Sequence, residues 1–83
     1  MPIHVKLLYF GQARDAAGLG EEEFILADRT SVSLLVTESS AAHPRIEKMR
    51  GSMQVAVNEE IAELSQQLRD GDVVAFLPPV AGG

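Results

Sequence analysis

Apolar residues gather near the start of the chain into short runs with the spacing of β-strands. From Ile3 to Phe10, branched, leucine and aromatic residues dominate until Gly11 interrupts them, which is typical of a strand. Residues 22–27 alternate weakly and predict a second strand that pairs with the first. Residues 12–17, between the two runs, are rich in alanine and predict a single helical turn.

The middle of the chain changes to the spacing of a helix. Thr30 and Ser31 can each place a side-chain oxygen on the free amides of a first helical turn. Pro44 disfavours helical geometry at His43, so the predicted helix ends near Ala42. The apolar positions that recur at helical spacing are Val32, Leu35, Val36 and Ala42.

The last third of the chain returns to strand patterns. Residues 45–49 predict a brief second helical turn, and residues 53–57 predict a third strand that ends at a polar turn. Residues 61–64 are a candidate for a further short strand. Residues 70–72 have the composition of a turn, and the nearly continuous apolar run at residues 73–77 predicts a central strand. One sheet covered on one face by a helix, an α+β domain, follows from this order.

Composition narrows the function classes. The 83 residues correspond to one domain or less at about 150 residues per domain. Seven Lys and Arg against twelve Asp and Glu give a net charge of −5, which has the wrong sign for binding nucleic acid through phosphates and favours basic protein partners. The absence of cysteine excludes disulfides, thiolate metal sites and a cysteine nucleophile.

Few side chains are candidates for chemistry. His4 and His43 lie about forty positions apart in the sequence and suggest neither a metal site nor a catalytic pair. The serines show no G-x-S-x-G setting and are interpreted as caps or solvated positions. Asp70 and Asp72 are interpreted as a simple turn, and Glu21–Glu23 as a solvated edge. We therefore expect no catalytic side chain and no metal.

No secretory or membrane segment is recognised. The apolar run near the start is far shorter than the roughly 20 residues of a membrane span. The sequence therefore predicts a cytoplasmic protein that contacts no membrane.

The end of the chain is its most informative segment. Two prolines after an apolar strand cannot continue a central ladder, so the chain divides into a domain at residues 1–77 and an extended tail at residues 78–83. Six residues at about 3.3–3.6 Å each reach about 20 Å. The final glycines lack Cβ atoms and can pass through a narrow channel in another protein; a frayed end is the alternative. The tail residues are Pro78, Pro79, Val80, Ala81, Gly82 and Gly83.

Three segments, at residues 7–15, 54–58 and 70–83, resemble a known family. They are similar to the first strand and turn, the third strand and the ending of the ubiquitin-like sulfur carriers that form the small subunit of molybdopterin synthase. The resemblance spans nearly the whole chain, and the Pro-Pro pair before the diglycine is its most specific part. It implies a β-grasp fold, a mixed sheet of four to five strands packed on one main helix, with the last strand beside the first.

The resemblance also implies a function for the tail. The Gly83 carboxylate is adenylated by an ATP-dependent activating enzyme and becomes a thiocarboxylate. Two such carriers then supply the dithiolene sulfurs that the large synthase subunit installs on a pyranopterin precursor, in a heterotetramer of two small and two large subunits. The carrier itself binds no cofactor and acts as a sulfur donor without catalytic side chains. An ionised carboxylate, with a pKa of about 3.3–3.7, is a poor electrophile and requires such activation.

Partner binding requires an apolar surface outside the core. Strand alternation puts Ala75 and Leu77 on the face opposite to Val74 and Phe76, and Leu8 and Phe10 opposite to Leu7 and Tyr9. We predict Phe10 and Leu77 as partner contacts; the alternative is that both belong to the core. Two other functions stay open: a related carrier for thiamine or another thio-cofactor, or a protein modifier; and an interaction module without chemistry.

Overall fold

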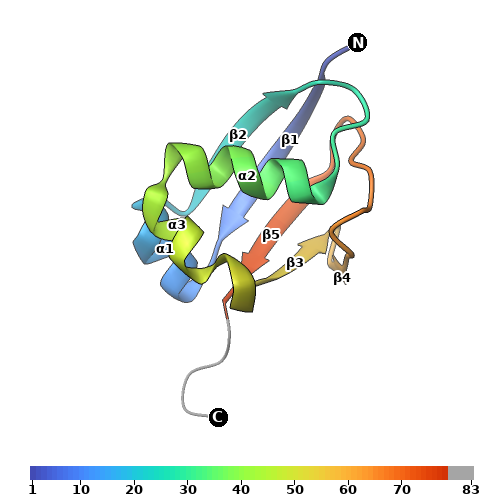
Figure 1. The fold of residues 1–83 in the computed structure, drawn as a ribbon. Coiled ribbons are helices and arrows are strands. Elements are labelled where there is room, and N and C mark those ends of the chain that lie inside the picture. Colours follow the sequence, from blue (N-terminus) through green and yellow to red (C-terminus); the bar gives the residue numbers. More distant parts are fainter. Residues whose placement is uncertain (79–83) are drawn as a thin grey trace.

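The computed structural model describes residues 1–78 of the chain and shows one sheet with helices on one side (Figure 1). The elements in chain order are β1 (Ile3–Tyr9), α1 (Gly11–Ala17), β2 (Glu21–Leu26), α2 (Val32–Ala42), α3 (Pro44–Met49), the 3-10 turn η1 (Arg50–Ser52), β3 (Gln54–Val57), β4 (Glu60–Ile61) and β5 (Val73–Leu77).

The sheet has five strands in the order β2-β1-β5-β3-β4. β1 pairs with β2 in antiparallel fashion and with β5 in parallel fashion, while β3 lies antiparallel to both β5 and β4. Helix α2 crosses one face of this sheet (Figure 1). The prediction of an α+β fold with a mixed sheet, a central last strand and the last strand beside the first is confirmed.

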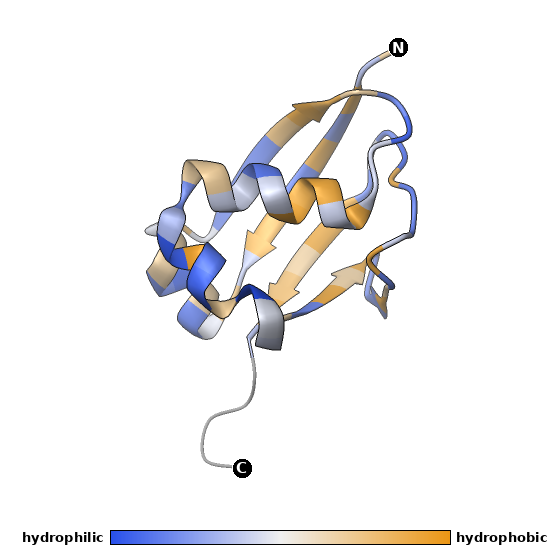
Figure 2. Cartoon of the chain, viewed as in Figure 1, coloured by the Kyte–Doolittle hydropathy of each residue, from blue (hydrophilic) through white to orange (hydrophobic). Residues whose placement is uncertain are grey.

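The core lies between α2 and the sheet, whose strands are largely apolar in composition (Figure 2). Leu7 and Tyr9 of β1, and Val74 and Phe76 of β5, are at most 2% exposed. They alternate with residues that face away from α2, as the period of two requires. The predicted assignment of the two faces of β1 and β5 is therefore confirmed for the buried set.

Helix α2 begins and ends as predicted, but its buried face differs from the prediction. The Ser31 hydroxyl accepts the N–H of Leu34 at 3.2 Å and caps the helix. Ala42, expected in the core, is exposed, while Ser39 and Ser40 are buried. The buried stripe continues from Val32, Leu35 and Val36 at intervals of three and four residues, and that spacing leads to Ser39 and Ser40. The interpretation of these two serines as solvated is wrong.

The short elements also differ from their predicted bounds. β1 ends at Tyr9 because Phe10 is the N-cap of α1, which has seven residues rather than a single turn. β4 covers only Glu60–Ile61, not residues 61–64. Asn58 and Glu59 form the preceding turn with φ angles of 51° and 73°. No helix within residues 1–78 has the length and apolar character to span a membrane.

Candidate partner-docking face

Phe10 and Leu77, the two predicted partner contacts, lie side by side at one end of the sheet. The parallel register pairs Tyr9 with Phe76, so the residues that follow occupy neighbouring positions. Phe10 keeps extended backbone angles, with φ −121° and ψ 151°, and is 47% exposed. Leu77 is half-buried. Both residues lie on the face that α2 does not cover, so the alternative of two core residues is wrong for Phe10.

Further apolar residues extend this surface across the strands. Ala75 pairs with Leu8 on one side and with Ala56 on the other, and Ala56 pairs with Ile61. The two central alanines are small, so a partner can approach the backbone closely between larger side chains. We call this surface the open-face strip, and its residues are Leu8, Phe10, Ile61, Ala75 and Leu77, together with Ala56, which is buried between Ala75 and Ile61.

Ile61 is the one large member of the open-face strip that sequence reasoning missed. It is 62% exposed, and the hairpin turn at Asn58–Glu59 places it opposite Ala56. One signal in the sequence could have indicated this position. Ile61 follows the Asn58–Glu59 turn closely, and a tight hairpin turn fixes which residues of the two strands lie opposite each other. The predicted strand at residues 61–64 did not give this register.

Acidic side chains border the strip along β2. Glu21 pairs with Leu8 and Glu23 pairs with Lys6 in the antiparallel register, and both carboxylates are exposed. The Lys6 ammonium lies 3.5 Å from a Glu21 carboxylate oxygen, so only part of this negative charge is offset. The edge favours a partner with basic side chains around an apolar contact.

Pro78, the first residue of the predicted tail, is the last residue that the structure describes. β5 ends at Leu77, and Pro78 is half-buried without being part of a strand. A Cβ atom built on Gly11 would lie 3.3 Å from the Pro78 ring, and Gly11 has φ +50°, so a side chain at this position would crowd the root of the tail. The other predicted tail residues, Pro79, Val80, Ala81, Gly82 and Gly83, lie outside the described residues.

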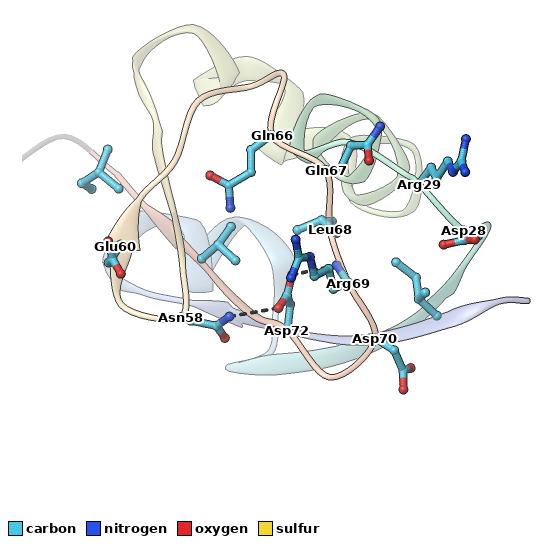
Figure 3. A pocket seen from close by; sticks show the side chains of 13 residues that line it. Asp28, Arg29, Asn58, Glu60, Gln66, Gln67, Leu68, Arg69, Asp70 and Asp72 are labelled. Carbon is cyan, nitrogen blue, oxygen red and sulfur yellow. Dashed lines mark hydrogen bonds between the residues drawn. The ribbon is translucent and has the colours of Figure 1, made fainter.

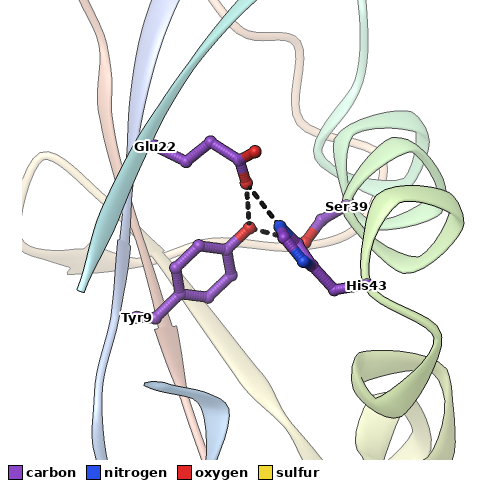
Figure 4. Close-up of polar contacts among 4 residues, drawn as sticks. All are labelled: Tyr9, Glu22, Ser39 and His43. Atoms are coloured by element: carbon purple, nitrogen blue, oxygen red, sulfur yellow. Dashed lines mark hydrogen bonds and ion pairs between the residues drawn. The ribbon is translucent and has the colours of Figure 1, made fainter. Parts of the chain in front are cut away.

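A polar cluster beneath the helices connects β1, β2 and α2 with His43, the residue between α2 and α3 (Figure 4). The Tyr9 hydroxyl donates to a Glu22 carboxylate oxygen at 2.8 Å and lies 2.9 Å from the Ser39 hydroxyl. The same Glu22 oxygen lies 2.8 Å from His43 Nε2. Burial, which disfavours the phenolate, is the main reason that the Tyr9 pKa is raised.

This cluster gives Glu22 and His43 structural roles. Glu22 is half-buried and points toward α2, unlike its exposed neighbours Glu21 and Glu23, so the prediction of a solvated edge is wrong for this one residue. The His43 imidazole is half-buried, with its Nε2 on the Glu22 carboxylate. Its ring also contacts the Tyr9 ring edge to face, with centroids 5.8 Å apart.

A second polar region, a hollow of about 830 Å³, lies where β1 and β5 begin (Figure 3). One Asp72 oxygen accepts from the Asn58 amide at 2.9 Å, and the other accepts the Arg69 N–H at 2.8 Å. Asp70 accepts the His4 N–H at 2.8 Å, and this bond lowers the Asp70 pKa. These contacts are those of a turn, as predicted. Across residues 1–78, no three metal-ligating side chains come together.

Proteins of similar sequence identify the family of this chain. The sequence matches the model of the ThiS family over residues 7–83. The chain belongs to the ThiS family. A relative from Mycobacterium tuberculosis, named a molybdopterin synthase sulfur carrier subunit, is 44% identical to this chain. The alignment spans 98% of this chain and 99% of the relative. The protein of that name from Escherichia coli is 36% identical and covers 95% and 99%.

Solved structures agree with the family assignment. A putative molybdopterin converting factor subunit 1 from Pyrococcus furiosus superposes with a TM-score of 0.86 at 31% identity, covering 94% of this chain and 99% of that one. SAMP1 from Haloferax volcanii superposes with a TM-score of 0.87 at 25% identity, covering 96% and 99%. The β-grasp fold expected from the resemblance is thus confirmed.

Proposed function

We propose that this chain is the sulfur-carrier subunit of a molybdopterin synthase and that its Gly83 carboxyl group carries the sulfur. The observation that carries the proposal is near full-length similarity to proteins with that name, together with a sequence that ends in Gly82-Gly83. The chain has no cysteine, so it has no side-chain thiol that could hold a persulfide.

The terminal carboxylate requires activation before it can accept sulfur. One of its oxygens attacks the α-phosphate of ATP, which an activating enzyme binds, and pyrophosphate leaves. Hydrosulfide then attacks the acyl carbon and expels AMP, which leaves a thiocarboxylate on Gly83. In the synthase, this sulfur attacks a carbon of the pyranopterin precursor and displaces an oxygen substituent from it, and hydrolysis of the resulting thioester leaves the sulfur on the pterin and returns the Gly83 carboxylate. The activating enzyme supplies ATP chemistry, so the carrier needs no catalytic side chain.

The open-face strip supports the second half of this function, which is delivery. Phe10 and Leu77 lie at the root of the tail, where a partner must bind in order to receive Gly83. The large synthase subunit and the activating enzyme therefore use the same face in turn. A complex of two carriers and two large subunits gives each carrier its own active site, because one tail can enter only one pocket at a time.

The test is the mass of the intact chain after co-expression with its activating enzyme. Exchange of one oxygen for sulfur at Gly83 is the expected result, and conversion of the precursor by the carrier and large subunit together is the expected activity. An unchanged mass in the presence of an active activating enzyme and ATP would refute the carrier function and favour an interaction module without chemistry.

The similarity to SAMP1, whose name stands for small archaeal modifier protein 1, favours a protein modifier as the second candidate. The same activated Gly83 would then form an isopeptide bond with a lysine, with AMP as the leaving group. Mass spectrometry of cell extracts distinguishes a protein modifier from a sulfur carrier. Lysines of other proteins that carry the C-terminus of this chain support the modifier. A thiocarboxylate on Gly83, together with precursor conversion, supports the carrier. A carrier for thiamine or another thio-cofactor would form the thiocarboxylate without converting the pyranopterin precursor.

A further inference from the structure

An apolar groove lies on the opposite side of the β3–β4 edge from the open-face strip. It has a volume of about 950 Å³ and runs between the end of the helices and the loop that follows β4. Glu47, Arg50 and Glu63 stand among its charged lining residues. The apolar residues that line it are Val36, Met53, Val55, Ile61, Ala62 and Leu64.

The groove combines a buried floor with exposed apolar walls. Val36 and Val55 are buried, whereas Leu64 is 57% exposed, so an apolar side chain placed here would remove Leu64 from water. The loop that carries Leu64 is held in place, because the Leu64 carbonyl accepts the N–H of Ser33 at 2.9 Å. The groove is therefore formed before any ligand arrives, which lowers the entropic cost of binding.

Position connects the groove with the root of the tail. Gln54, one of the lining residues, pairs with Leu77, the last residue of β5. Ile61 lines the groove and also belongs to the open-face strip. A protein that receives the tail beyond Pro78 therefore stands beside the groove, and the strip and the groove meet at Ile61.

Charge and hydrogen bonding narrow the kind of occupant. Arg50 lies 3.5 Å from Glu47 and donates to the Thr37 hydroxyl at 2.9 Å, whereas Glu63 forms no ion pair with any residue of the described part. The uncompensated charge is negative. The Val55 carbonyl already accepts the N–H of Ala62 at 2.9 Å, so the edge favours side-chain recognition over addition of a further strand.

We propose that this groove binds a segment of the large synthase subunit that carries an aliphatic or aromatic side chain next to a lysine or arginine. The apolar side chain fills the space over Val36 and Val55, and the basic group pairs with Glu63. This inference rests on the proposed function, since it names a second contact of the same partner. The groove would anchor the large subunit at the sheet edge while the open-face strip holds it at the tail.

Calorimetric titration of the full-length carrier with the large subunit tests the groove. Leu64→Asp is expected to weaken binding by about tenfold or more, and Glu63→Lys to weaken it less and to reduce its salt dependence. Leu34→Asp is the matched control, because Leu34 on α2 is 55% exposed and does not line the groove. If Leu64→Asp binds the large subunit within about twofold of the wild-type affinity, the groove is not a contact site for this subunit. The same conclusion follows if a parallel titration shows that Leu64→Asp weakens binding of the activating enzyme alone.

A photo-crosslinking side chain at position 64 gives a second measurement that does not depend on the charged variant folding. Crosslinks to the large subunit from position 64, but not from position 34, support the groove. No crosslink, or equal crosslinks from both positions, overturns it. Wild-type affinity distinguishes the two levels of inference: no binding of the large subunit by wild type refutes the proposed function, whereas equal binding by wild type and Leu64→Asp refutes only the groove.

Discussion

The buried Tyr9 hydroxyl is expected to make a measurable contribution to stability. Replacing it in Tyr9→Phe removes the bond to Glu22 at 2.8 Å and the contact with Ser39 at 2.9 Å, while the ring keeps its packing. Ser39 is fully buried, so its hydroxyl loses a partner without gaining water. The Glu22 side chain is 26% exposed and keeps its contact with His43, so water offsets part of its loss.

The size of the effect follows from these environments. A hydrogen bond to a charged acceptor is worth about 1.5–3 kcal/mol, and an orphaned buried hydroxyl costs about 1 kcal/mol or more. Because Glu22 is partly hydrated, we reduce the first contribution to about 1 kcal/mol, add about 1 kcal/mol for the Ser39 hydroxyl, and expect Tyr9→Phe to lower the free energy of unfolding by about 2 kcal/mol. For a domain of this size each kcal/mol shifts Tm by about 4–8 °C, which gives a fall of about 8–16 °C.

Urea and thermal denaturation at neutral pH, combined with a double-mutant cycle, test this reasoning. Ser39→Ala alone is expected to cost about 1 kcal/mol, because Tyr9 retains Glu22. In the Tyr9→Phe background the same change is expected to cost almost nothing, since the serine hydroxyl has already lost its partner. A Tyr9→Phe loss below about 0.5 kcal/mol, or an equal Ser39→Ala loss in both backgrounds, would refute the proposed network.

The alkaline arm of the stability profile provides an independent check on Tyr9. Its pKa is raised in the fold, mainly by burial, so the folded state holds the phenol proton more tightly than the unfolded state does. This contribution is complete below the ordinary tyrosine pKa of about 10 and is lost progressively as the pH rises above it. Wild type should lose stability in that range more steeply than Tyr9→Phe; parallel profiles would contradict the assignment.

Three further changes test the tail, the strip and the turn. Deleting Gly82 and Gly83, or adding one residue after Gly83, is expected to abolish sulfur transfer in a precursor-conversion assay. The Tm is expected to stay at its wild-type value. Retained sulfur transfer would argue against Gly83 as the carrier group. Leu77→Asp is expected to weaken binding of the large subunit by about tenfold or more, as measured by calorimetry. An unchanged circular dichroism spectrum is the control that the variant is folded. Unaltered affinity would show that Leu77 is not part of the docking face. The Asp70 pKa is lowered, chiefly by the His4 N–H, so the stabilising contribution of Asp70 is present above the ordinary aspartate pKa of about 3.9 and is lost as the pH falls below it. Asp70→Asn should therefore reduce the slope of the free energy of unfolding against pH in this acidic range. An unchanged slope would contradict the Asp70–His4 hydrogen bond.

Local patterns in the sequence were sufficient for the main elements of the fold. Strand alternation identified the buried faces of β1 and β5, because neighbouring side chains of a strand must point to opposite sides of a sheet. Ser31 and Pro44 marked the limits of α2, since capping and the missing proline N–H act within one helical turn. The β-grasp topology itself came from the resemblance of residues 7–15, 54–58 and 70–83 to a known family.

Contacts between distant parts of the chain could be decided only by the tertiary structure. Tyr9, Glu22 and Ser39 come from β1, β2 and α2, and His43 from the junction of α2 with α3. No pattern within one element reveals that a serine hydroxyl and a glutamate carboxylate meet the same buried tyrosine hydroxyl. Ile61 joins the open-face strip only because a tight hairpin sets its register against Ala56. The sequence alone pointed to Gly83 as the proposed carrier group. The packing of the sheet decided which apolar side chains lie around Pro78, because their positions depend on strand neighbours that are far apart in the chain.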